Sequence, residues 1–266
     1  MSSAPVGIFD SGIGGLTVAR AIYERLPSES TIYFGDTARV PYGPKSPDTV
    51  RRYSLEILRW LLDQGVKAVV IACNTSTAHA LEALQAASPV PVIGVIEPGA
   101  RAAAAASRGG PIGVIGTAGT IASNAYERAI HRIDPGARVE QRSCPLFVPL
   151  VEEGWFDHPA AELVAADYLA PLRAAGAEVL VLGCTHYPLL KPLLQRVVGP
   201  AVRLIDSAEA TAEALQATLR EENLEAPAGT RACPRFAVSD DVARFRQVGS
   251  RFLGDRLQEA EVVGVG

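Results

Sequence analysis

Residues 68–77, AVVIACNTST, and residues 178–188, EVLVLGCTHYP, carry the clearest structural signal in this chain. Each stretch begins with a short apolar run and then passes through a cysteine into small polar residues. Such a run, when a helical pattern follows it, is typical of a buried strand in a parallel sheet. We therefore expect a strand, a tight turn and a helix at both places.

Other segments also recur in the two halves of the chain. PVGIFDSGIGGLT at residues 5–17 resembles PIGVIGTAGTIAS at residues 111–123, and PVIGV at residues 91–95 resembles RLIDS at residues 203–207. Apolar runs alternate with segments of helical period throughout, which indicates an α/β protein with largely parallel strands. The repeat predicts two pseudo-symmetric parallel-sheet α/β domains.

The second half reads as an insertion into the first. We place the first domain at residues 1–97, completed by residues 207–266, and the second at residues 98–206. Expected strands are Val6 to Phe9, Thr31 to Gly35, Ala68 to Ala72, Val92 to Val95, Ile112 to Gly116, Arg138 to Arg142, Val179 to Gly183, Arg203 to Asp206 and Arg235 to Ser239. Expected helices are Leu16 to Leu26, Pro47 to Asp63, Ser76 to Ala87, Ser123 to Ile133, Ala160 to Ala174, Ala208 to Arg220 and Val242 to Leu253. Because ligands of parallel sheets bind beyond the carboxyl ends of the strands, the active site should lie in the cleft between the domains.

The composition favours a small-molecule partner. The 266 residues are 48% hydrophobic and 20% charged, and the formal net charge is −4. No window clusters the lysines and arginines of a nucleic-acid face. The N-terminal MSSAPVGIFD has no signal-peptide pattern, and no apolar run reaches membrane-spanning length, so we expect a cytoplasmic protein with no membrane association.

The four cysteines are expected to be reduced thiols, and their spacing does not match a structural zinc site. A thiol between a strand end and a helix start lies near unpaired backbone N–H groups, which favour the thiolate. Either Cys73 or Cys184 alone is readily explained as a small core residue. Two cysteines at matched places instead suggest a base and an acid on opposite faces of one carbon, which racemisation requires.

The chain resembles the glutamate racemases of the aspartate/glutamate racemase superfamily over nearly its whole length. The motifs that carry the resemblance are FDSGIGGLT from Phe9, GDTARVPYG from Gly35, ACNTST from Ala72, CPLFVPLVEEG from Cys144 and GCTHYP from Gly183. It implies racemisation without a cofactor, and it implies that Cys73 acts on D-glutamate and Cys184 on L-glutamate. Supply of D-glutamate for peptidoglycan and a homodimer are further implications.

The resemblance also implies roles for carboxylates and a histidine. Asp10 would assist Cys73 and receive the substrate ammonium, whereas its ordinary alternative is a helix N-cap. His186 could polarise the Cys184 thiol or hold its proton, or could be an ordinary loop histidine. Glu152 rather than Glu153 occupies the position of a carboxylate near the second thiol. Asp36 is a further supporting candidate, and Cys144 and Cys233 are expected to be structural.

Substrate carboxylates could be held by hydroxyls, amides and backbone N–H groups rather than by an arginine clamp. Such donors fall in the predicted strand-end loops, where threonine and asparagine are also common N-caps. The candidates are Asp10, Ser11, Tyr42, Gly43, Asn74, Thr75, Thr117, Thr120, Thr185 and His186. A metal site at Cys184 and His186 would need further ligands that the sequence does not supply, so no metal is expected.

Three other functions compete with this one. A pyridoxal-phosphate racemase needs a Schiff-base lysine, and none of Lys45, Lys67 and Lys191 lies at a predicted strand end. An aspartate or hydantoin racemase, or a one-thiol decarboxylase, could share the fold, although the second cysteine argues against the decarboxylase. A two-lobed amino-acid-binding protein would also close around a ligand, but it would normally be exported.

Overall fold

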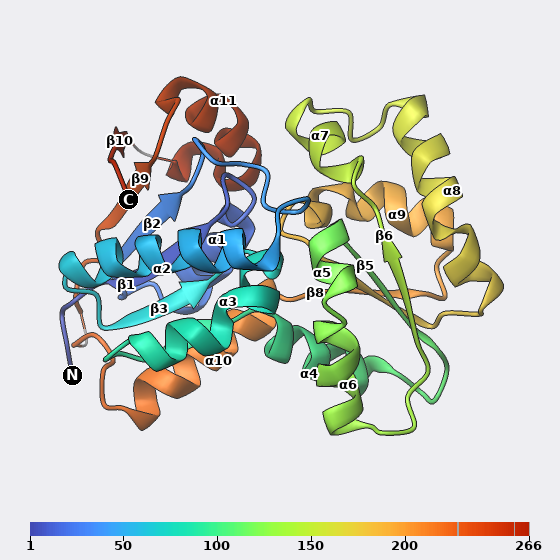
Figure 1. Cartoon of the computed structure of the whole chain (residues 1–266), viewed down its shortest axis with the longest axis horizontal. Helices are drawn as coiled ribbons and strands as arrows, with labels where there is room; N and C mark the ends of the chain where they lie inside the picture. The colour runs from blue at the N-terminus through green and yellow to red at the C-terminus, as the bar shows by residue number, and fades with distance from the viewer. Residues whose placement is uncertain (228, 258, 266) are drawn as a thin grey trace.

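Two parallel sheets form the framework of the molecule, as the computed structural model shows for residues 1–227, 229–257 and 259–265 (Figure 1). The first sheet has the strand order β10-β9-β2-β1-β3-β4, and the second has the order β6-β5-β7-β8. Every strand pair is parallel. The strands are β1 (Val6–Asp10), β2 (Thr31–Gly35), β3 (Ala68–Ile71), β4 (Val92–Gly94), β5 (Ile112–Gly116), β6 (Val139–Ser143), β7 (Val179–Gly183), β8 (Arg203–Asp206), β9 (Pro234–Val238) and β10 (Ala260–Val262). The predicted fold class is confirmed.

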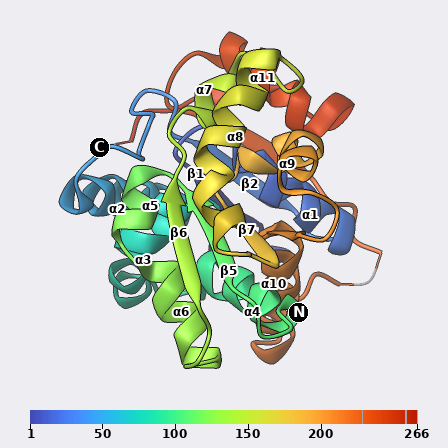
Figure 2. The same ribbon diagram turned by 90° about the vertical axis from the view of Figure 1, so that its right-hand side faces the viewer.

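Helices flank both sheets, and Figure 2 shows α6 and α8 beside β6, the edge strand of the second sheet. The helices are α1 (Leu16–Arg25), α2 (Pro47–Asp63), α3 (Asn74–Ala87), α4 (Ile96–Ala106), α5 (Ala118–Ala122), α6 (Ala125–Ile133), α7 (Phe147–Glu152), α8 (Pro159–Ala174), α9 (Lys191–Val198), α10 (Ala208–Glu221) and α11 (Val242–Leu253). Among the described residues, no helix is both long and apolar enough to cross a membrane.

The apolar runs of the sequence became the central strands. β1 lies between β2 and β3, β7 lies between β5 and β8, and all five residues of both strands are buried. A strand covered on both faces has no solvent side, which explains why these runs do not alternate with polar residues. At the edge, β6 reads VEQRS and alternates between half-buried and exposed positions.

The first sheet draws its strands from both ends of the chain, with the second sheet formed by the residues between. The proposed boundary after residue 97 falls inside α4, a helix that the sequence did not predict. α4 contains Pro98 and Gly99 in its first turn, where proline is tolerated because its missing N–H has no intrahelical partner. α5, α7 and β10 were also not predicted. The helix expected after Cys184 is α9, which begins only after a 3₁₀ turn at Tyr187–Leu190.

A buried ion pair fixes the start of β3. The Lys67 Nζ lies 2.6 Å from the Glu29 Oε2 and also donates to the Ser2 carbonyl at 2.8 Å. Only 3% of the Lys67 side chain and 4% of the Glu29 side chain are exposed. Neither charge has ready access to water, so each depends on its partner.

We expect Lys67→Met to lower the free energy of unfolding by about 3 kcal/mol, because it leaves the Glu29 carboxylate buried without its cation. The matched control is Arg25→Met, which removes an ion pair to Glu213 whose side chains are 42% and 59% exposed. That control should cost less than about 1 kcal/mol. Urea denaturation measures both, and equal losses would contradict the expectation.

Candidate active site

The loops at the carboxyl ends of the two sheets meet across the domain boundary. The Thr17 hydroxyl donates to the Thr185 carbonyl at 3.1 Å, and the Gly119 N–H donates to the Gly43 carbonyl at 2.9 Å. The Thr75 Oγ1 lies 2.8 Å from the Thr117 Oγ1. Strand-end loops of both sheets therefore share one buried polar region, as parallel α/β architecture predicts.

Cys73 follows β3 and caps the amino end of α3. Its Sγ accepts a hydrogen bond from the Ser76 N–H at 3.4 Å, and only 5% of the residue is exposed. Burial and the neighbouring Asp10 carboxylate raise the pKa of the Cys73 thiol to about 11, although hydrogen bonds from Ser76 and Ser11 oppose this rise. The Ser76 N–H at the helix start does favour the Cys73 thiolate as expected, but the expected net lowering of the pKa was wrong, because desolvation outweighs the helix N–H groups.

Asp10 is the last residue of β1 and is completely buried. Its carboxylate accepts from the Gly12 N–H at 3.0 Å and from the Thr185 hydroxyl at 3.5 Å. Burial raises its pKa, while His186 and the backbone N–H groups of Gly12 and Gly15 oppose that rise. The N-cap of α1 is Gly15, so the alternative of a helix cap for Asp10 is wrong.

Cys184, His186 and Glu152 form a line on the other side of the site. The His186 Nδ1 lies 4.0 Å from the Cys184 Sγ, and its Nε2 lies 3.0 Å from the Glu152 Oε1. Burial lowers the pKa of His186, but hydrogen bonds to Cys184 and Glu152 outweigh it and raise the value to about 10. Glu153, the rejected alternative, has a side chain that is 64% exposed.

The surroundings of the Glu152 carboxylate favour its charged form. Burial raises its pKa, but the hydrogen bonds and charges of His186 and Arg244 outweigh burial and lower it. The Arg244 guanidinium, on α11, lies 3.3 Å from the Glu152 Oε2. Sequence spacing gave no sign of Arg244, because α11 comes nearly a hundred residues after Glu152 and only the tertiary fold brings them together.

The predicted substrate-binding residues gather around these two groups. Thr75, Thr117 and Thr120 form a triangle of hydroxyls with oxygen separations of 2.8, 3.2 and 3.0 Å. Tyr42 packs against Cys73, and its hydroxyl donates to the Asp36 carboxylate. The Ser239 hydroxyl also donates to Asp36, at 2.8 Å, which supports the expected supporting role for that carboxylate.

Asn74 shows a contact that the sequence did not reveal. Its Oδ1 accepts from the Tyr126 hydroxyl of α6 at 2.7 Å, and both residues are buried. Tyr126 lies on a predicted helix, but a buried tyrosine on a helix is ordinarily explained by the core. Nothing in the pattern distinguished it from the other buried aromatic residues.

The two remaining cysteines stand apart from this chemistry. Cys144 is completely buried, and its thiol donates to the Arg142 carbonyl at 3.7 Å, as a structural role predicts. Cys233 is exposed, so its thiol does not pack in the core. Within residues 1–227, 229–257 and 259–265, no group of three or more His, Cys, Asp or Glu residues could hold a metal ion.

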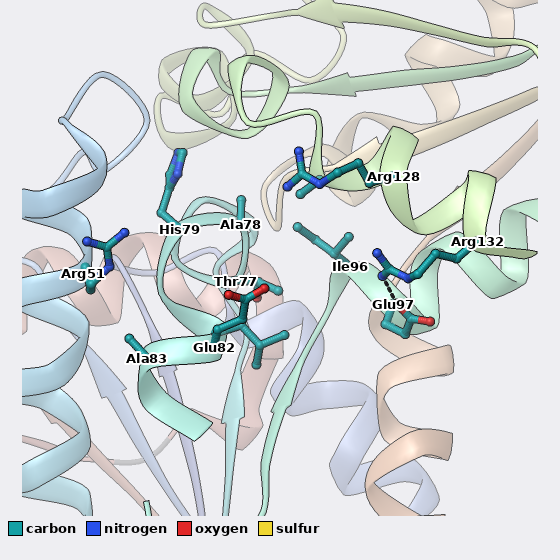
Figure 3. A pocket seen from close by; sticks show the side chains of 12 residues that line it. Arg51, Thr77, Ala78, His79, Glu82, Ala83, Ile96, Glu97, Arg128 and Arg132 are labelled. Carbon is teal, nitrogen blue, oxygen red and sulfur yellow. Dashed lines mark hydrogen bonds and ion pairs between the residues drawn. The ribbon is translucent and has the colours of Figure 1, made fainter. Parts of the chain in front are cut away.

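Two cavities lie near the domain boundary. One of about 390 Å³ is bounded by Val40, Pro41 and Val148 and reaches the candidate residues Gly43, Thr117 and Glu152, so it adjoins the site. The other, of about 520 Å³, lies along α3, with Arg51, His79 and Arg128 around it (Figure 3). Neither Cys73 nor Cys184 lines either cavity.

Comparison with known proteins agrees with this arrangement. The model of the Asp/Glu/Hydantoin racemase family matches residues 16–215. The chain belongs to this racemase family. It is 56% identical over 260 residues to a glutamate racemase of Geobacter metallireducens, covering 98% of this chain and 96% of that one. A glutamate racemase of Neisseria meningitidis is 51% identical over 263 residues, covering 98% and 97%.

Solved structures of the racemase family have the same fold. The glutamate racemase of Bacillus anthracis superposes with a TM-score of 0.94 at 41% identity, covering 99% of this chain and 98% of that one. That of Francisella tularensis, solved with D-glutamate, gives 0.93 at 40% identity, covering 99% and 98%. The resemblance inferred from the sequence motifs is confirmed, and the chain is a racemase, hence an isomerase.

Gly14 gives a direct test of how tightly the two domains fit at this racemase site. A Cβ at Gly14 would overlap the His186 Nδ1 and the Thr185 Oγ1, whereas one at Gly12 would meet only Val40, no closer than 3.4 Å. We expect Gly14→Ala to reduce kcat/KM by at least about tenfold, because it would displace His186 and Thr185 from their positions in the candidate site. Gly12→Ala should retain most activity, and steady-state racemisation assays compare the two. Similar losses in both variants would contradict this account of Gly14.

The raised pKa of His186 predicts a pH dependence of stability. The folded pKa, about 10, exceeds the ordinary histidine pKa of 6.5, so the folded protein binds this proton more tightly than the unfolded chain. The resulting stabilisation is complete below about pH 6.5 and is lost as the pH rises towards about 10. We expect the free energy of unfolding of the unsubstituted protein to fall more steeply across this window than that of His186→Gln. Urea denaturation at each pH measures both, and parallel curves would refute the assignment.

Proposed function

We propose that this racemase interconverts L-glutamate and D-glutamate through two thiols, Cys73 and Cys184, without a cofactor. The observation that carries the proposal is the matched placement of the thiols. They follow β3 and β7, one strand of each sheet, and both are buried beside loops that meet across the domain boundary. The racemases of Geobacter metallireducens and Neisseria meningitidis, with 56% and 51% identity to this chain over the aligned residues, act on glutamate according to their names.

The surroundings of the thiols suit them to opposite roles in the resting enzyme. The pKa of Cys73, raised to about 11 by burial and by Asp10, keeps it protonated at neutral pH, so it is ready to act as an acid. Cys184 instead lies beside His186, which can hold its proton. We therefore assign Cys184 as the base and Cys73 as the acid in the conversion of L-glutamate.

In this mechanism one thiol removes a proton from Cα and the other returns a proton to the opposite face. The Cys184 thiolate takes the Cα proton of L-glutamate, breaking a C–H bond and forming an S–H bond. The Cys73 thiol gives its proton to the opposite face of Cα, and D-glutamate leaves. The thiols have exchanged protonation states, which is the form that accepts D-glutamate at Cys73. Asp10 would receive the substrate ammonium, since its carboxylate is the buried anion beside Cys73.

The substrate carboxylates would be held by neutral donors. The hydroxyls of Thr75, Thr117 and Thr120, the Asn74 amide and nearby backbone N–H groups supply enough hydrogen bonds without an arginine clamp. Ser11, Tyr42, Gly43 and Thr185 complete the proposed binding set. We propose a cytoplasmic homodimer that supplies D-glutamate for peptidoglycan, with the domain boundaries given above.

The competing pyridoxal-phosphate mechanism finds little support in the lysines. Lys67 is committed to a buried ion pair with Glu29, and Lys191 pairs with Asp206. An absorbance spectrum of the purified protein tests the mechanism, because a bound aldimine would replace the two-thiol scheme with Schiff-base chemistry.

The decisive assay follows L-glutamate and D-glutamate in deuterated water without added cofactor. We expect racemisation with one solvent deuteron incorporated at Cα of the product. Chiral chromatography over a panel that includes aspartate and hydantoins tests the substrate, and faster inversion of aspartate than of glutamate would overturn this choice.

We expect Cys73→Ser and Cys184→Ser each to reduce kcat by roughly 10²- to 10⁴-fold, since each removes one acid or base from the reaction. Enantiomers have equal free energies, so kcat/KM must fall equally in both directions. Calorimetry should show that glutamate still binds both variants. Unchanged turnover in either variant would defeat the two-thiol scheme.

A further inference from the structure

Tyr126 connects the two domains at a buried point beside Cys73. It lies on α6, next to the second sheet, and none of its surface is exposed. Its hydroxyl donates to the Oδ1 of Asn74, which directly follows Cys73 and is 3% exposed. A hydrogen bond this far from solvent holds its partners in one geometry more firmly than a surface bond does.

The tyrosine ring has little freedom to move. A Cβ at Gly183 would lie 3.0 Å from the ring, and one at Gly99 would lie 3.3 Å from the hydroxyl oxygen. The Ser207 side chain, beside Gly99, also hydrogen-bonds the phenol. Ser207 can donate to that oxygen, which leaves the Tyr126 proton free to point at Asn74.

The other half of the Asn74 amide is unsatisfied. Its Nδ2 is buried and has no hydrogen-bond partner among the described residues. A buried N–H without an acceptor is costly, and such orphans in native structures call for an explanation. A carboxylate of the substrate is the acceptor that this site would receive.

We propose that Tyr126 is a positioning residue: by occupying the Asn74 Oδ1, it turns the Asn74 N–H donors toward a carboxylate of the substrate. The two ends of an amide have nearly the same shape, so without this bond the group can rotate and present its oxygen instead. Oxygen facing a carboxylate would repel it. The inference rests on the proposed function, because it assigns the carboxylate to the substrate of that reaction.

The first test is Tyr126→Phe, which removes only the hydroxyl. We expect KM for glutamate to rise about tenfold while kcat changes little, because the lost order weakens carboxylate binding rather than proton transfer. The matched control is Tyr23→Phe, which removes a part-buried hydroxyl that accepts from Thr31 at 3.2 Å in the first domain. A merely structural role for Tyr126 would lower the melting temperature and leave KM unchanged, which would overturn the proposal.

The second test is Asn74→Asp, which keeps an acceptor for Tyr126 but has no N–H donor. We expect KM to rise by more than in Tyr126→Phe, since a carboxylate would now face the substrate carboxylate. Wild-type KM in Asn74→Asp would overturn the proposal. Because the two residues act as one unit, Tyr126→Phe should add no further rise in KM to Asn74→Ala, and additive effects would also overturn it.

These outcomes are separable from failure of the proposed function. The unsubstituted enzyme is assayed first on glutamate and on the racemase substrate panel. If it racemises another amino acid, the glutamate assignment fails, and the same KM ratios are measured on that substrate, which also carries a carboxylate. The role of Tyr126 is then judged on its own result.

Discussion

The arrangement of this molecule depends on one constraint: the carboxyl ends of two parallel sheets are pressed against each other. Polar residues that would normally face solvent at strand ends are thereby buried, including Asp10, Cys73, Asn74 and His186. Burial without partners would be prohibitive, so most of their polar groups are paired across the boundary or with nearby backbone. Most polar groups of the site are therefore hydrogen-bonded, and a few buried ones, such as the Asn74 Nδ2, have no partner among the described residues.

The same burial explains the electrostatics. Desolvation is the largest single influence on the pKa values of Asp10, Cys73 and His186. It raises the pKa of Asp10 and Cys73, whereas its lowering effect on His186 is outweighed by Cys184 and Glu152. Cys73 faces a carboxylate, which disfavours a second negative charge. His186 faces a thiol and a carboxylate, which favour its positive charge. Two thiols at matched strand ends therefore acquire different acid–base surroundings from the residues that the fold brings beside each one.

The sequence predicted those features of the fold and the site that depend on neighbouring residues in the chain. Apolar runs located β1, β3, β5 and β7 because strands buried on both faces must be apolar throughout. Motif resemblance supplied Glu152, which composition alone could not separate from Glu153. The Tyr126 contact to Asn74 and the Arg244 contact to Glu152 could not be predicted, because each joins segments far apart in the chain. These contacts depend on how the domains pack, which the hydrophobic periodicity of the sequence does not reveal.

The pKa of Cys73 was misjudged for a related reason. A helix start does lower the pKa of a thiol, and the Ser76 N–H does contact the Cys73 sulfur. The sequence does not show how much water the second domain excludes from that sulfur, nor that Asp10 lies beside it. A two-thiol racemase passes through states in which one or the other thiol is protonated. A protonated Cys73 is therefore compatible with the proposed mechanism. In the proposed two-thiol scheme, this protonated form of Cys73 is the one that accepts L-glutamate.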